Sequence, residues 1–296
     1  MNRLAHDLKQ MTLTTGVGAM LTRCQRTTGL QLIARELTQM GHTKLTARSI
    51  KPIHIEKLIA KWKADGLSTG TIKNRMSWIR YWTGGVRRSS IASADNSEHG
   101  IGTRAAFNGD KARTTVGAAL AKLGEREQLV VRMQMAFGMR LEESILVNVN
   151  QAWQGDALHM QASWCKGGRA RVIPIVHERQ RALLDEVRSL VGTASLIPLG
   201  MDKHTYRRQI ERKTWAAGIR NVHGHRHWYC QWRYRTMTGR QCTAAGGRPY
   251  EQLTRKERGA DWMARKIISR EVGHERVSIT DCYLGYRFAR RQAVTA

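Results

Sequence analysis

The sequence predicts a mainly α-helical protein with a small β-hairpin, which is an α+β fold arranged in two domains. Three observations support this class. Apolar residues recur at helical spacing in both halves of the chain. A glycine- and serine-rich stretch without periodicity separates the halves. Two short apolar segments in the second half flank a glycine pair, a pattern typical of a hairpin. The length of 296 residues is sufficient for two ordinary domains.

Residues 1–84 predict a helical domain. The segment 29–41 places its apolar side chains on one stripe, and the segment 52–66 repeats this pattern between Pro52 and Gly66. The segment 68–82 begins with Ser68, a suitable N-cap. Its polar face carries Lys73, Asn74, Arg75 and Arg80. A solvated helix face would have the same composition, so this helix alone does not decide its role.

The chain changes character at residues 85–111, which are rich in Gly, Ser, Asn and Asp and predict a flexible interdomain linker. The remaining residues, 112–296, predict a mixed second domain. Four of its segments have helical periodicity: 124–137, 178–192, 202–218 and 261–273. Short strand candidates at 157–163 and 169–176 flank the hairpin turn, and the polar stretch 238–260 predicts an inserted loop.

The composition is strongly basic, because 50 Lys and Arg residues face 23 Asp and Glu, for a net charge of +27. Such an excess destabilises a compact chain unless a polyanion neutralises it, and nucleic acid is the polyanion we expect. A basic protein without such a partner is the alternative. No apolar run approaches the roughly 20 residues of a membrane span, so we expect no membrane partner. Five scattered cysteines and an N-terminus without an apolar signal core predict a reduced, intracellular protein.

The segment HGHRH, residues 223–227, concentrates three histidines and one arginine. Zinc binding is one interpretation, but histidines at i and i+2 do not share a helical face, and no CxxC pair occurs. An arginine among the ligands would also repel a cation. A phosphate clamp agrees better, because a guanidinium holds two phosphate oxygens and an imidazole adds a hydrogen bond. Capping or packing stays an alternative for single histidines, His225 or His227.

Further motifs surround this cluster in a fixed order. The first is G-M-R-x-x-E, with Arg140 and Glu143, and the second is a lysine eight residues before a proline, Lys166 and Pro174. The third is H-x-x-R-H, with His223, Arg226 and His227, and the last is G-H-x8-Y, with His274 and Tyr283. Together they resemble the motifs of the tyrosine recombinases, or phage-type integrases. Residues 1–84 are similar, more loosely, to the core-binding domain of integrases from bacterial mobile elements. The interval between Arg226 and His274 is longer than usual in that family, and the stretch 238–260 accounts for the excess.

The resemblance implies an N-terminal core-binding domain and a catalytic domain that carries out transesterification of DNA. Arg140 and Arg226 would neutralise charge on the phosphate in the transition state. Tyr283 would attack phosphorus and form a 3′-phosphotyrosine. Lys166 would protonate the leaving 5′-oxygen as general acid. These cationic side chains would replace metal ions, so we expect neither a metal nor a cofactor.

The resemblance assigns the remaining polar residues to the phosphate, to its support and to DNA contacts. His223 and His274 would bind the phosphate or move the tyrosine proton, and Glu143 and His227 would brace the cationic cluster. The residues expected to contact DNA outside the catalytic cluster are Lys73, Asn74, Arg75, Arg80, Arg207 and Arg208.

The expected function is therefore site-specific recombination of double-stranded DNA. By the resemblance, four copies would act on two recombination sites through a Holliday junction, with accessory DNA-bending proteins as further partners, in the bacterial cytoplasm at the nucleoid. Two other functions stay open: a type IB topoisomerase that acts as a monomer, and a non-catalytic DNA-binding protein of the same fold. The short N-terminal domain favours a recombinase over the topoisomerase, and the complete set of motifs favours an enzyme.

Overall fold

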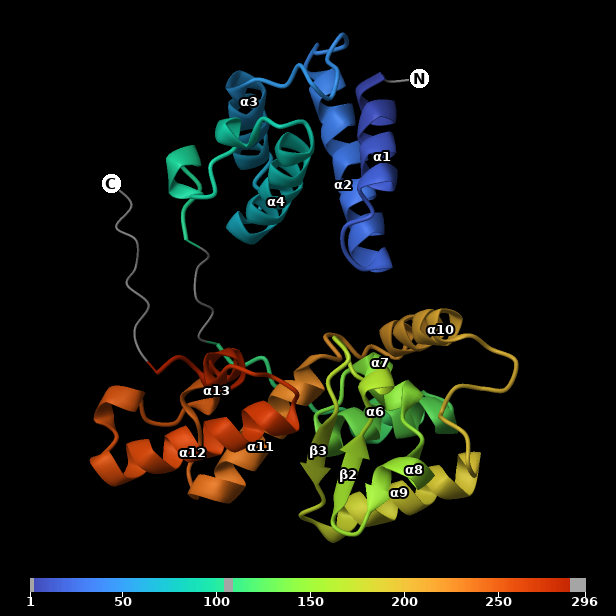
Figure 1. Ribbon diagram of the computed structural model, residues 1–296. Helices are drawn as coiled ribbons and strands as arrows, with labels where there is room; N and C mark the ends of the chain where they lie inside the picture. Colours follow the sequence, from blue (N-terminus) through green and yellow to red (C-terminus); the bar gives the residue numbers. More distant parts are fainter. Residues whose placement is uncertain (1–2, 104–108, 288–296) are drawn as a thin grey trace. The chain divides into compact units, whose positions relative to one another are not determined.

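The computed structural model of the chain describes residues 3–103 and 109–287 (Figure 1). These residues form two compact units, the first within 3–103 and the second within 109–287. The first unit is helical, and the second combines helices with a three-stranded antiparallel sheet. The predicted mainly α, α+β class is confirmed. No helix of the described residues is long and apolar enough to cross a membrane.

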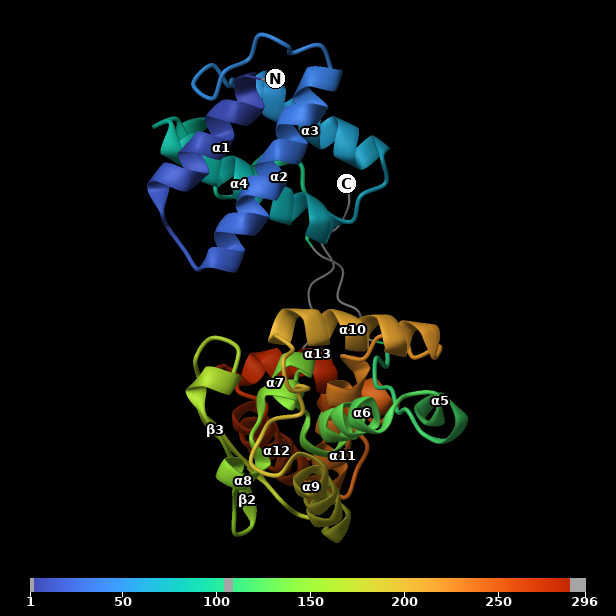
Figure 2. The same ribbon diagram turned by 90° about the vertical axis from the view of Figure 1, so that its right-hand side faces the viewer.

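Four helices build the first unit, and α1 lies alongside α2 (Figures 1 and 2): α1 Arg3–Thr15, α2 Met20–Gln39, α3 Pro52–Ala64 and α4 Thr69–Gly85. Ser68 caps α4 as predicted, because its side chain accepts a hydrogen bond from the Thr71 N–H. Two fully buried tryptophans anchor the core. Trp62 donates to a carboxylate oxygen of Glu36, and Trp82 donates to the carbonyl of residue 47, each at 2.8 Å.

The first part of the predicted linker is structured rather than free. Two short 3-10 turns, η1 Ser89–Ile91 and η2 Ser97–His99, follow α4. Ala92 and Ile101 are buried in the core of the first unit. Isolated apolar residues like these carry no periodic signal, which explains why the polar composition concealed the packing. Residues 104–108 of the predicted linker lie outside the described residues.

The second unit contains the sheet and most of the helices. The strands, in the order β1-β2-β3, are β1 Trp153–Gln154, β2 Ala157–Met160 and β3 Arg171–Pro174. The β2–β3 hairpin was predicted, and β1 adds a short third strand to it. The helices are α5 Gly117–Ala121, α6 Glu125–Phe137, α7 Leu141–Leu146, α8 Val149–Ala152, α9 Glu178–Val191, α10 Lys203–Ala216, α11 Gly224–Thr238, α12 Arg255–Glu271 and α13 Asp281–Leu284.

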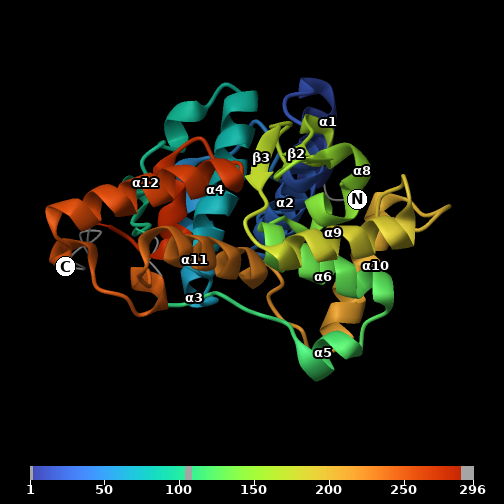
Figure 3. The ribbon, with the colours of Figure 1, turned by 90° about the horizontal axis from the view of Figure 1, so that it is seen from below.

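The central helix of the second unit is α11, which contacts α6, α12 and α13. Helix α9 lies alongside α6, and α12 packs against both α11 and the strand β3 (Figures 1 and 3). Buried residues from all these elements, including Phe137, Ile173, Leu184 and Ile268, form one continuous core. This arrangement brings the ends of α6, α11 and α12 close to the nucleophile candidate on α13.

The predicted loop 238–260 contains two short turns, η4 Thr243–Ala245 and η5 Tyr250–Gln252. Helix α12 begins at Arg255, earlier than the predicted start at 261. The reason is a capping box, in which Thr254 and Glu257 bond each other's backbone N–H groups. The polar composition of this first turn concealed the helix.

Candidate active site

A tight turn after α6 positions Arg140. The helix ends at Gly138, which has a φ of +59°, and a Cβ there would lie 2.4 Å from the Tyr229 ring. This position therefore requires glycine. Arg140 follows as the N-cap of α7, and its backbone N–H donates to Glu143 Oε2 at 2.8 Å. Its Nη1 donates to Glu143 Oε1 at 2.6 Å. The three-residue spacing of the motif thus lets the Glu143 carboxylate accept from the backbone and the side chain of the N-cap residue Arg140.

Glu143 is the centre of a cluster of three arginines. Its carboxylate is 1% exposed and accepts hydrogen bonds from Arg171 Nη1 and Nη2 at 3.2 and 2.7 Å. Arg226 Nη1 lies 3.6 Å from Oε2. Burial by itself would raise the pKa of Glu143, but the charge and hydrogen bonds of Arg171, with Arg226 and Arg140, lower it to about 2. One carboxylate thus holds three guanidinium groups, and the cluster keeps a net positive charge.

Arg226 and Tyr283 meet in the interior of the second unit. Arg226 is 1% exposed, and its Nη1 donates to the Gly138 carbonyl at 2.6 Å while Nη2 donates to the Val272 carbonyl. Its Nε donates to the Tyr283 hydroxyl at 3.2 Å. His274 Nε2 lies 3.1 Å from the same hydroxyl. The ends of α6 and α12 thereby lock Arg226 in one orientation beside the tyrosine.

Burial and neighbouring charges set the protonation states of Tyr283 and His274 at neutral pH. Burial raises the pKa of Tyr283 to about 12, although the Arg226 charge opposes this shift. Burial, with the charges of Arg226 and Arg140, lowers the pKa of His274 to about 4. A protonated tyrosine therefore faces a neutral imidazole, whose Nε2 can accept the tyrosine proton. His227 packs edge-on against the Tyr283 ring at 4.7 Å between centroids.

The other predicted residues lie on the open side of this cluster. Lys166 is exposed in the loop between β2 and β3, and within the described residues its amine makes no hydrogen bond or ion pair. His223 is exposed at the start of α11. Partial desolvation of its ring lowers its pKa, and the charges of Arg226, Arg140 and Lys166 act in the same direction. The Arg140 side chain is 22% exposed. The structure thus brings the motif residues together around one position, with a closed inner side and an open outer side.

Comparisons with known proteins bear on the first unit and on the fold. Residues 1–89 match the family described as phage integrase, N-terminal. No match was found among the curated proteins. Among solved structures, the chain is similar to a lambda integrase dimer bound to a COC′ core site, with a TM-score of 0.60 and 13% identity over 98% of this chain and 78% of that one.

Two further structures are similar over nearly the whole chain. One is the Tn1549 transposon integrase in complex with circular intermediate DNA, with a TM-score of 0.58 and 13% identity over 96% of both chains. The other is the XerH site-specific recombinase bound to difH substrate, with a TM-score of 0.55 and 15% identity over 96% of this chain and 82% of that one. This chain has the tyrosine-recombinase fold. The resemblance drawn from the motifs is thereby confirmed.

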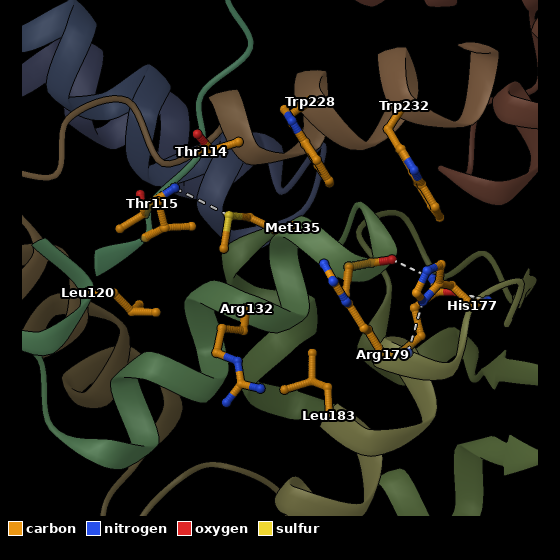
Figure 4. A pocket seen from close by; sticks show the side chains of 13 residues that line it. Thr114, Thr115, Leu120, Arg132, Met135, His177, Arg179, Leu183, Trp228 and Trp232 are labelled. Carbon is orange, nitrogen blue, oxygen red and sulfur yellow. Dashed lines mark hydrogen bonds between the residues drawn. The ribbon is translucent and has the colours of Figure 1, made fainter. Parts of the chain in front are cut away.

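Within this recombinase fold, the opposite side of α11 serves packing. His225 is fully buried and hydrogen-bonded to the Thr115 hydroxyl at 2.8 Å. Burial lowers its pKa to about 4, so the ring stays neutral. Thr115 and the parallel rings of Trp228 and Trp232 line a separate pocket of about 500 Å³ (Figure 4). His225 therefore packs within the second unit, whereas Arg226 and His227 contact Tyr283. No group of three or more His, Cys, Asp or Glu side chains within 3–103 and 109–287 is arranged to hold a metal ion.

Two of the residues on α4 that are predicted to contact DNA also make bonds within the first unit. Arg75 donates to Glu36 Oε1 at 2.8 Å with both side chains nearly buried, and its guanidinium lies over the Trp62 ring. Arg80 donates to the carbonyl of Ser93 at 2.7 Å and thereby ties down the segment after α4. These guanidinium groups therefore support the first unit, and their contact with DNA stays a prediction.

The other predicted DNA contacts are more accessible. Asn74 is exposed and Lys73 is half-buried on the same face of α4. Arg207 and Arg208 are exposed on α10. Arg207 shares its charge with Glu211 and Glu142 at the helix surface, and exposed pairs of this kind are weak enough for a phosphate to compete.

Sequence reasoning missed the buried ion pairs that support the site. Arg233 donates twice to the Glu271 carboxylate, at 2.6 and 3.0 Å. Arg265 bonds Asp281, the first residue of α13, and the carbonyl of Gly285, at 2.9 and 3.0 Å. Arg265 therefore holds both ends of the short helix that carries Tyr283. Helical spacing on α11 and α12 gave one available signal, because Arg233 and Arg265 fall on the same faces as buried apolar residues.

Proposed function

We propose that this protein is a site-specific DNA recombinase that cleaves and rejoins duplex DNA through a 3′-phosphotyrosine at Tyr283. The observation that carries the proposal is the Tyr283 hydroxyl, which lies 3.2 Å from Arg226 Nε and 3.1 Å from His274 Nε2. A nucleophile, a charged donor and a neutral base meet at one oxygen. The net charge of +27 supports DNA as the substrate, as do the DNA complexes among the similar structures.

The scissile phosphate would enter from the open side of the site, where Arg140, Lys166 and His223 are accessible to solvent. Arg140 and Arg226 are joined through Glu143, so both guanidinium groups keep a defined separation before DNA binds. Preorganised donors stabilise charge that develops on the phosphate oxygens, and each such donor typically contributes about 3–4 kcal/mol to the transition state. This support does not require reorganisation at the moment of reaction.

In the cleavage step, the bond from the Tyr283 oxygen to phosphorus forms while the bond from phosphorus to the 5′-oxygen breaks. The tyrosine proton passes to His274 Nε2, and Lys166 donates a proton to the leaving 5′-oxygen. Because the pKa of Tyr283 is about 12, the hydroxyl has to lose its proton during the attack rather than before it. Rejoining is the reverse reaction, with a 5′-hydroxyl attacking the phosphotyrosine.

We further propose that four copies act together on two recombination sites. One active site cleaves one strand, so exchange between two duplexes requires four cleavages. Strands exchanged in pairs pass through a Holliday junction, which keeps the broken ends within one assembly. We also propose that accessory DNA-bending proteins take part in recombination and that the protein acts at the bacterial nucleoid.

Covalent capture tests the proposed chemistry. The protein is incubated with a library of nicked duplexes of randomised sequence, and adducts are isolated on a denaturing gel and sequenced. We expect an adduct that selects one site. Tyr283→Phe removes one oxygen and should abolish capture. Tyr286→Phe is the matched control, three residues further along the chain, and should retain capture.

The opposite outcomes separate the alternatives. An adduct that persists in Tyr283→Phe but disappears in Tyr286→Phe would reassign the nucleophile. Relaxation of a supercoiled plasmid that lacks the selected site would favour a type IB topoisomerase. DNA binding by the unmutated protein without any adduct would favour a non-catalytic DNA-binding protein.

A further inference from the structure

A third arginine of the cluster lies between the catalytic residues and the loop that carries Lys166. Arg171 is the first residue of β3, and its side chain is 4% exposed. Besides its two bonds to Glu143, its Nη1 lies 3.0 Å from Cys165 Sγ and its Nε donates to the Glu271 carbonyl at 2.9 Å. One planar guanidinium therefore contacts the hairpin loop, the cluster centre and the end of α12.

On its inner side, Arg171 is linked to both catalytic arginines through Glu143. The Glu143 oxygens that accept from Arg171 also accept from Arg140 at 2.6 Å and lie 3.6 Å from Arg226. A movement of Arg171 would therefore shift the carboxylate that orients both. Gly273, next to His274, also packs against the Arg171 side chain, since a Cβ there would lie 3.2 Å from Arg171 Cδ.

On its outer side, Arg171 reaches the residue that precedes Lys166. Cys165 is buried, whereas Lys166 and the glycines 167 and 168 are exposed. Both glycines have positive φ, and a Cβ on either would meet nothing within 4 Å, so packing does not hold this part of the loop. The ion pair between Arg169 and Glu275 is exposed at both ends and contributes little. The Cys165–Arg171 contact is thus the buried anchor at the start of the loop.

We propose that Arg171 is a positioning residue that couples the Lys166 loop to the Arg140–Arg226 pair. It would keep the proton donor Lys166 at a fixed position relative to the two arginines that bind the phosphate. The inference rests on the proposed transesterification. Lysine cannot replace it, because a single ammonium lacks the planar fork that reaches three acceptors in different directions. A misplacement of about 1 Å in a catalytic group can cost about 100-fold in rate.

The test compares two versions of the duplex selected by covalent capture: the ordinary one, and one in which sulfur replaces the bridging 5′-oxygen at the cleaved bond. The sulfur leaving group needs no proton, so it should rescue Lys166→Ala, whose loss of a general acid typically costs about 10²–10⁴ in rate. We expect Arg171→Lys to slow single-turnover cleavage of the ordinary duplex about 100-fold. The sulfur duplex should restore the part of that loss that comes from a misplaced Lys166, so the loss of rate should be clearly smaller on the sulfur duplex than on the ordinary one, and the affinity for DNA should stay nearly unchanged.

Two further variants separate positioning from stability. Cys165→Ala removes the outer contact of Arg171 together with a small part of the core. It should be slow on the ordinary duplex and rescued by the sulfur duplex, whereas Cys165→Ser keeps an acceptor and should cleave at a nearly normal rate. Arg233→Lys is the matched control. Arg233 is also buried and also contacts Glu271, but within the described part of the chain it makes no hydrogen bond or ion pair with the loop. Any loss of rate in Arg233→Lys should be the same with both duplexes.

The inference is overturned if Arg171→Lys is equally slow on both duplexes, as Arg233→Lys should be. Should Arg171→Lys fail to fold, Cys165→Ala decides, and a normal rate in that variant would overturn the proposal. If the unmutated protein cleaves neither duplex, the proposed function itself fails, and this result is distinct from a failure of Arg171 alone.

Discussion

Replacing Glu143 by glutamine should destabilise the second unit, because it removes the carboxylate that contacts all three arginines of the cluster. The folded protein lowers the pKa of this group from 4.5 to about 2. Each pKa unit corresponds to about 1.4 kcal/mol, so the ionised carboxylate stabilises the fold by about 3 kcal/mol. Removal of one partner from a buried ion pair typically costs about 3–5 kcal/mol, which agrees with this value. Little solvent screening is expected, since Glu143 is 1% exposed.

The effect should depend on pH in a defined direction. A carboxylate with a lower pKa in the folded state than in the unfolded state stabilises the protein above its unfolded pKa, here 4.5, and loses this contribution as the pH falls toward 2. Glutamine has no such titration. The difference in unfolding free energy between wild type and Glu143→Gln should therefore be nearly constant from pH 7 to 5 and shrink below about pH 4.5.

Urea unfolding followed by hydrogen exchange of peptides from α6, α7 and α12 would measure this difference for the second unit alone. The control is Glu142→Gln, since the neighbouring Glu142 is 41% exposed and bonds only the surface residue Lys203 and, more distantly, Arg207. Its effect should stay within about 0.5 kcal/mol. Equal effects of the two substitutions at pH 7, or a Glu143→Gln effect that does not change with pH, would refute the role assigned to the carboxylate.

Three other outcomes are expected. DNA affinity should fall with salt at a slope of about −6 or steeper in log K against log salt, and a slope near zero would remove nucleic acid as the main partner. Cleavage in excess EDTA should stay within a few-fold of the control, because guanidinium and ammonium groups already supply the positive charge; loss of activity that magnesium or zinc restores would contradict this. Gly138→Ala should destabilise the protein by about 2–4 kcal/mol, since it adds a clash with Tyr229 to the cost of positive φ. Gly155→Ala, with a φ of +58° and open space around it, should cost only about 1–2 kcal/mol, and equal losses in thermal unfolding would exclude the clash.

Local features of the fold could be predicted from the sequence. The Ser68 cap, the start of α3 at Pro52 and the β2–β3 hairpin depend on neighbouring residues and on short-range spacing, and all three occur as predicted. The same holds for the spacing between Arg140 and Glu143, which is the geometry of one helix turn. Patterns of this kind report which face of an element is apolar and where the element starts.

The sequence did not determine which polar residues pair across the fold. Arg75 has a basic, solvent-facing appearance in the sequence, yet its partner Glu36 lies 39 positions away on another helix. Local periodicity contains no information about such a distance, so the sequence did not predict that Arg75 supports the packing of the first unit.

The tertiary structure alone decided how the proposed catalytic cluster is organised. The sequence by itself predicted Arg140, Arg226, His274 and Tyr283 as its members, because their motifs keep a fixed order and spacing. It did not assign Arg171, whose partners Glu143 and Glu271 lie 28 and 100 positions away. A buried charge is stable only where the fold provides a partner, and that partner exists only once α7, β3 and α12 have packed together.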